Sequence, residues 1–237
     1  MEPVEAAADF VATRFPDARA AFVGGSVLTP DRTHTSDLDV VVLLDGPPAP
    51  YRETFRHDGW VVEAFVHTRE SLGHYYEHDR SRRVCSLLRM CAESVVLRDT
   101  AGVAADVREE ARRRIAEGPA ALTDRERDAM RYALTDLLDD LAGCRSDAER
   151  PYIAAAVTTR TARLALAAAG AWSGNGKALH RALRSVEPDL ATRVVDAHRR
   201  AVCDASGGDL RAVAFDVLDR VGGPLSEGYR LAGRSSD

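Results

Sequence analysis

Two short stretches decide the fold of this protein: Phe22-Val23-Gly24-Gly25-Ser26, and, ten residues later, Asp37-Leu38-Asp39-Val40-Val41-Val42-Leu43-Leu44. The second stretch predicts a buried β-strand over residues 37–44, and residues 20–23 predict a shorter strand that ends at the glycines. Side chains alternate across a strand, so Asp37 and Asp39 are expected on the same face. Two carboxylates on one face are suitable ligands for a divalent cation.

The residues between the two strands suit an anionic ligand. Gly24 and Gly25 let the backbone approach a triphosphate closely and offer it N–H groups. Ser26 adds a hydroxyl, and the segment after it can present a helix N-terminus to phosphates. Ser36, directly before Asp37, is a further candidate contact. The turn therefore predicts a nucleotide-binding loop beside the paired carboxylates.

A third carboxylate is expected from a neighbouring strand. Two metal ions about 3.5–4 Å apart need at least one bridging carboxylate. Glu63 is a lone acid in the apolar run Trp60-Val61-Val62-Glu63-Ala64-Phe65-Val66, where an unpaired charge is costly. It is the best candidate to complete the site with Asp37 and Asp39, as a metal ligand and as a base. The alternative for Glu63 is a solvent-facing position or an ion pair with an arginine.

The order of expected elements divides the chain into an α+β part and a helical part. A helix is expected over residues 4–15, a hairpin about Asp58-Gly59 over residues 51–67, helices over 69–83 and 84–92, and a strand at 95–97. Beyond residue 100 the pattern is helical, over residues 102–117, 124–143, 147–169, 176–186, 188–205 and 209–221. The expected domains are a mixed β-sheet with flanking helices at residues 1–101 and an all-α helical bundle at 102–237.

The composition excludes several classes of protein. The formal net charge of −5 argues against a broad nucleic-acid surface. No apolar run is long enough to cross a bilayer, and no leader-like N-terminus is present, so we expect no membrane partner and a cytoplasmic location. The four cysteines have no metal-finger spacing and are expected to be reduced thiols.

The spacing of Gly24-Gly25-Ser26, Asp37-Leu38-Asp39 and Glu63 resembles the DNA polymerase β-like nucleotidyltransferase superfamily. The resemblance covers roughly residues 15–70. The helical half, through the segment Ala171-Trp172-Ser173-Gly174-Asn175-Gly176-Lys177, is similar to kanamycin and related aminoglycoside nucleotidyltransferases. Many superfamily members have Asp as the third carboxylate, whereas antibiotic-modifying branches often use Glu.

The resemblance implies an Mg²⁺-dependent transfer of a nucleoside monophosphate, most simply AMP from ATP, to a hydroxyl of a small molecule. Two Mg²⁺ ions and a nucleoside triphosphate donor are expected, and aminoglycosides are candidate acceptors. The resemblance also implies a homodimer and an acidic base from the helical domain, with Asp136, Asp139 and Asp140 as candidates. A solvated acidic helix face is the favoured explanation of these three residues. The alternative function is an antitoxin-like or regulatory protein that binds or adenylylates a protein partner.

Overall fold

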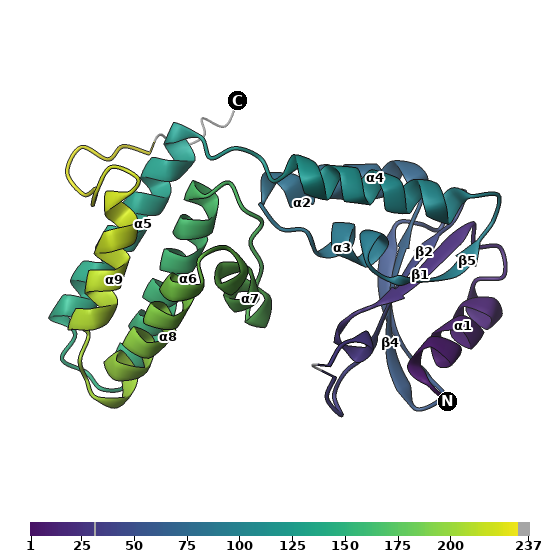
Figure 1. Ribbon diagram of the computed structural model, residues 1–237, viewed down its shortest axis with the longest axis horizontal. Coiled ribbons are helices and arrows are strands. Elements are labelled where there is room, and N and C mark those ends of the chain that lie inside the picture. The colour runs from purple at the N-terminus through teal and green to yellow at the C-terminus, as the bar shows by residue number, and fades with distance from the viewer. Residues whose placement is uncertain (31, 232–237) are drawn as a thin grey trace. The chain divides into compact units, whose positions relative to one another are not determined.

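The computed structural model describes residues 1–30 and 32–231 and divides the chain into two compact units, Met1–Gly118 and Pro119–Asp237. The expected α+β class is confirmed: the first unit holds a mixed five-stranded sheet with flanking helices, and the second unit is helical (Figure 1). Each unit is described by itself.

The sheet of the first unit has the strand order β3-β4-β2-β1-β5. The strands are β1 (Ala20–Gly24), β2 (Leu38–Leu43), β3 (Tyr51–His57), β4 (Trp60–His67) and β5 (Val95–Asp99). The β2–β4 pair is parallel, and the other three neighbouring pairs are antiparallel. The predicted hairpin is confirmed: β3 and β4 are joined at Asp58-Gly59, where both residues have positive φ (45° and 82°). Such a two-residue turn matches the twist of the strands it connects.

Helices cover both faces of this sheet (Figure 1). They are α1 (Pro3–Arg14), α2 (Arg69–Ser81), α3 (Ser86–Ala92) and α4 (Val103–Glu117). Phe10 and Val11 of α1 share a buried core with Val40 and Val42 of β2, which point to one face. Helices α2, α3 and α4 contact β4, β2 and β1. Asp39 alternates along β2 with the residues of the α1 core, so the opposite face carries the carboxylate.

The boundary between the two compact units lies after Gly118, later than the domain boundary expected after residue 101. Helix α4 belongs with the first unit because it packs against α3, β1 and β5. It ends at Gly118, whose φ of 83° is the left-handed conformation that favours glycine, and Pro119 follows. The pattern of helical residues alone cannot show that this helix packs on the preceding sheet.

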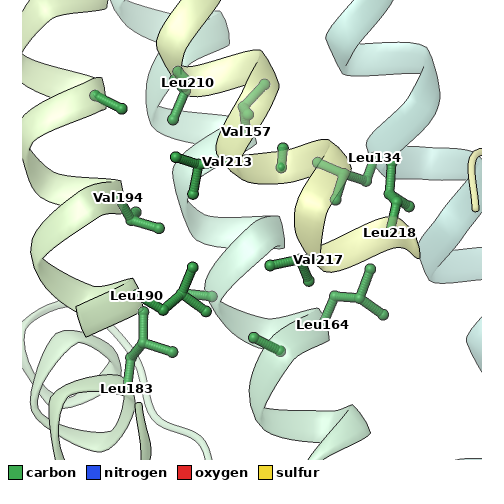
Figure 2. Close-up of a cluster of buried hydrophobic side chains, with 14 of the residues drawn as sticks. Leu134, Val157, Leu164, Leu183, Leu190, Val194, Leu210, Val213, Val217 and Leu218 are labelled. Atoms are coloured by element: carbon green, nitrogen blue, oxygen red, sulfur yellow. The ribbon is translucent and has the colours of Figure 1, made fainter. Parts of the chain in front are cut away.

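The second unit is a bundle with an apolar core of leucine, valine and alanine (Figure 2). Its helices are α5 (Asp124–Gly143), α6 (Arg150–Ala168), α7 (Lys177–Val186), α8 (Pro188–Cys203) and α9 (Gly208–Asp219). Leu134 of α5, Leu164 of α6 and Leu218 of α9 are fully buried there. Helix α5 begins with a capping box in which Thr123 and Glu126 bond each other's backbone N–H groups.

All the expected helices and strands are present, with ends that differ by a few residues. Among the described residues, no helix combines the length and apolar character that crossing a membrane requires.

Candidate functional site

Two of the predicted carboxylates lie side by side because their strands pair in register. Asp39 on β2 and Glu63 on β4 are direct partners in the parallel β2–β4 pair. Both are partly buried. Side chains at paired positions project from the same face of the sheet. The register therefore places the two carboxylates together on the face opposite α1.

Asp37 completes the cluster from a different position than expected. It lies just before β2, which begins at Leu38, so it is not a strand residue paired by alternation with Asp39. Its carboxylate nevertheless reaches the other two: one oxygen from each of Asp37, Asp39 and Glu63 lies within 4.8 Å of the others. The cluster forms because Asp37 lies in the loop directly before the first residue of β2.

The chemistry of this cluster fits a hard divalent cation. Three carboxylate oxygens in reach of one ion are the ligands that Mg²⁺ prefers, with remaining positions left to water and substrate phosphates. Without a cation, three clustered negative charges repel one another. Within residues 1–30 and 32–231, no other group of three acidic, histidine or cysteine side chains meets the same geometric condition.

Arg52, a residue that the sequence analysis did not single out, contacts the cluster. Its guanidinium pairs with Oε2 of Glu63 and lies over the Phe65 ring, 4.8 Å from the ring centroid. The arginine is 58% exposed, whereas the glutamate is 23% exposed. Arg52 and Phe65 are direct partners across the β3–β4 hairpin. Counting residue pairs outward from the Asp58-Gly59 turn pairs Arg52 with Phe65 and so places Arg52 on the same sheet face as Glu63. The hairpin register could therefore have predicted this contact.

Gly25 has no space for a side chain. A Cβ at this position would lie 2.3 Å from Oδ2 of Asp39, and the residue has a φ of +91°. Both observations require glycine. The turn thus brings backbone into direct contact with a carboxylate of the cluster.

Gly24 is needed for a different reason. A Cβ there would lie 2.2 Å from the hydroxyl oxygen of Ser94, which is itself buried. The glycine therefore packs against the segment before β5. This packing is compatible with the nucleotide contact predicted for Gly24, which stays a prediction.

Ser26 and Ser36 are joined across the loop that separates β1 from β2. Their hydroxyl oxygens lie 3.1 Å apart, and the backbone N–H of Thr33 donates to Oγ of Ser36 over 3.0 Å. The segment Ser26–Leu28 is a single 3₁₀ turn. The helix N-terminus expected after the turn is therefore that of one 3₁₀ turn, and the hydroxyls and turn amides are the groups that can meet an anion.

A pocket of about 650 Å³ lies beside the carboxylates within the first unit. Residues of the β3–β4 hairpin form one wall, and residues of α2, α3 and β2 form the others. We call it the β3–β4 pocket. Asp39 and Arg52 line it, so the pocket borders the carboxylate cluster. Its volume suits a small molecule.

His67 lines this pocket as a neutral ring. It is 5% exposed, and burial lowers its pKa to about 4. Its Nδ1 lies 3.4 Å from Oγ of Ser71, and the Tyr75 ring meets it edge-on with centroids 5.0 Å apart. His67 therefore adds no positive charge to the pocket at neutral pH.

The three acidic residues considered as a base from the helical domain are exposed on α5. Asp136, Asp139 and Asp140 all lie in the second unit. Their exposure fits the solvated-face interpretation. A catalytic contribution from them stays a prediction.

Comparison with known proteins adds a fold-level likeness. No family model matches the chain, and no curated protein matches it either. Among solved structures, the chain is similar to a nucleotidyltransferase-like protein from Exiguobacterium sibiricum 255-15, with a TM-score of 0.47 and 13% sequence identity. The match covers 92% of this chain and 73% of that chain. The functional argument therefore rests on the geometry of the site.

Proposed function

We propose that the protein is an Mg²⁺-dependent nucleotidyltransferase that moves a nucleoside monophosphate, most simply AMP from ATP, to a hydroxyl of a small molecule. The observation that carries this proposal is the cluster of Asp37, Asp39 and Glu63, with ligand oxygens within 4.8 Å of one another. It stands beside a glycine-serine turn on one side and a small-molecule pocket on the other.

Each residue has a distinct part in binding the donor. Asp37, Asp39 and Glu63 would hold two Mg²⁺ ions, which when bound neutralise the negative charge of the triphosphate and of the departing pyrophosphate. The turn at Gly25 and Ser26 would donate backbone N–H groups to phosphate oxygens. The hydroxyl of Ser36, held by Ser26 and by the amide of Thr33, would add a directed donor.

Glu63 has two oxygens with different surroundings. Oε2 accepts from Arg52, which orients the carboxylate, and Oε1 has no hydrogen bond from the described residues. In the proposed transfer the acceptor oxygen bonds to the α-phosphorus, the bond to pyrophosphate breaks, and the hydroxyl proton passes to Glu63 Oε1. The carboxylate is thereby both a ligand and the base.

Thermal unfolding with each of the four nucleoside triphosphates, with and without Mg²⁺, tests the donor site. A ligand that binds only the native protein raises the unfolding midpoint. We expect a Mg²⁺-dependent rise with one triphosphate, ATP in the simplest case, and its loss in Asp39→Asn. Asp17→Asn removes the same charge from an exposed turn residue and should leave the rise intact.

No rise with any triphosphate would overturn the proposal. A search for a stably bound protein would then follow, because the antitoxin-like alternative predicts a partner complex without nucleotide transfer. Equal responses from Asp39→Asn and wild type would reject the carboxylate cluster as the metal site.

A further inference from the structure

The position of the β3–β4 pocket relative to the carboxylates indicates which of the two substrates, donor or acceptor, it would bind. The strand order β3-β4-β2-β1 places the Gly25 turn at the β1 side of Asp39 and the pocket at the β4 and β3 side. Nucleotidyl transfer requires the attacking and leaving oxygens to lie roughly in line. If the pyrophosphate leaves over the turn, the attacking hydroxyl must come from the opposite side, where the pocket lies.

The wall of the pocket is mainly apolar and aromatic. Phe65 of β4 and Tyr75 of α2 contribute rings, and Leu87 and Met90 of α3 contribute aliphatic surface. Pro50 closes the wall before β3. Side chains of this kind bind a flat apolar body by excluding water and by ring contacts.

The charged groups of the wall do not suit a polycation. Two carboxylates line the pocket among the described residues, Asp39 and Asp79. Asp39 belongs to the metal cluster, and burial raises the pKa of Asp79, which disfavours its charged form. The guanidinium of Arg52 adds a positive charge at the pocket edge. A substrate with several ammonium groups would need a wall rich in carboxylates.

We propose that the β3–β4 pocket is the acceptor site and that it takes an uncharged hydroxyl compound with a flat apolar body, in preference to a polycationic aminoglycoside. The inference rests on the proposed nucleotidyl transfer for its chemical step. That step joins the acceptor oxygen to the α-phosphorus, releases pyrophosphate, and moves one proton from the hydroxyl to Glu63. The occupancy of the pocket can be measured without any turnover.

The first experiment uses 2-naphthol as the probe, because it is uncharged, flat and carries one hydroxyl. Its binding to the full-length protein is followed by its fluorescence, with kanamycin A as a competitor. We expect saturable 2-naphthol binding that kanamycin A does not displace. Absence of saturable binding, or displacement by kanamycin A, would overturn the proposal.

Two variants on α3 locate the probe. Met90→Asp places a carboxylate in the pocket wall, whereas Arg89→Asp places the same group on the neighbouring exposed position, outside the wall. We expect at least about tenfold weaker 2-naphthol binding in Met90→Asp only, because a carboxylate covered by the bound probe would lose its water without gaining a partner. Circular dichroism of both variants checks folding. Equal binding by a folded Met90→Asp protein would place the probe elsewhere and reject the pocket.

The transfer is tested separately with α-labelled ATP and Mg²⁺. Label appearing on 2-naphthol and not on kanamycin A supports both proposals. Probe binding without any Mg²⁺-dependent ATP response would leave a small-molecule pocket and overturn nucleotidyl transfer. An ATP response with label on kanamycin A alone would keep the proposed function and overturn the acceptor class.

Discussion

A Cβ on Gly25 would lie 2.3 Å from Oδ2 of Asp39, so the turn after β1 packs directly against the Asp39 carboxylate of the acidic cluster. The contact explains why the Gly-Gly-Ser turn and the Asp-x-Asp segment occur together in this sequence. The lack of a side chain at Gly25 leaves the Asp39 carboxylate the space that it occupies.

This relationship predicts a selective effect of Gly25→Ala. The methyl group must displace the Asp39 carboxylate, and we expect Mn²⁺ affinity, measured by the spin-resonance signal of free Mn²⁺, to fall at least about tenfold. Gly59→Ala is the matched control: Gly59 also has a positive φ, but no atom lies within 4 Å of the position that its Cβ would take. Gly59→Ala should lose roughly 1–2 kcal/mol of stability through backbone strain. Gly25→Ala should lose more, because its backbone (φ 91°, ψ 179°) lies in a region that is essentially restricted to glycine. Equal Mn²⁺ affinities would refute the link between turn and carboxylate.

Gly24→Ala should lower stability through a clash with Ser94. Over-packing of this kind costs about 1–3 kcal/mol. The double variant Gly24→Ala/Ser94→Ala removes the hydroxyl at 2.2 Å and leaves the Ser94 Cβ at 3.3 Å, a contact that a small shift relieves. Urea unfolding of both variants measures the effect. Failure of the second substitution to restore any stability would show that another contact is responsible.

Arg52→Gln should raise divalent-metal affinity. The guanidinium pairs with Glu63 and places a positive charge beside the cation site, so its removal lowers electrostatic competition. We expect Mn²⁺ to bind roughly two- to tenfold more tightly at low salt, with little change in stability because the arginine is largely exposed. Arg56→Gln, an exposed arginine on the same strand, should change neither quantity. Weaker Mn²⁺ binding in Arg52→Gln would instead assign the arginine an orienting role that outweighs its charge.

His67 predicts an acid-sensitive contribution to stability. Burial lowers the pKa of His67 to about 4, below its usual 6.5, so the unfolded chain binds a proton in this interval and the folded protein does not. Stability from this residue is therefore complete above about pH 6.5 and is lost as the pH falls toward 4, in total on the order of 3 kcal/mol. The difference between the unfolding free energies at pH 7 and pH 5 should be smaller in His67→Gln than in wild type. His34→Gln, at an exposed position, should keep the wild-type pH dependence.

Local sequence was sufficient to predict most helices and strands and the three carboxylates. The short apolar run after Asp37, rich in β-branched valines, favours a buried strand, and the lone acid in the run around Glu63 marks the second strand of the site. These signals depend on spacing within a few residues, and such spacing is read directly from the chain.

Long-range pairing decided the rest. The register that sets Asp39 opposite Glu63 joins strands separated in the chain by β3, and the β3–β4 pocket needs α2 and α3 folded over that sheet face. The same applies to Ser94 against Gly24 and to α4 in the first unit. The sequence by itself determined which residues are candidates for the chemistry, through alternation and turn chemistry. Only the tertiary structure decided which of them meet, because packing between distant segments sets strand register and helix placement.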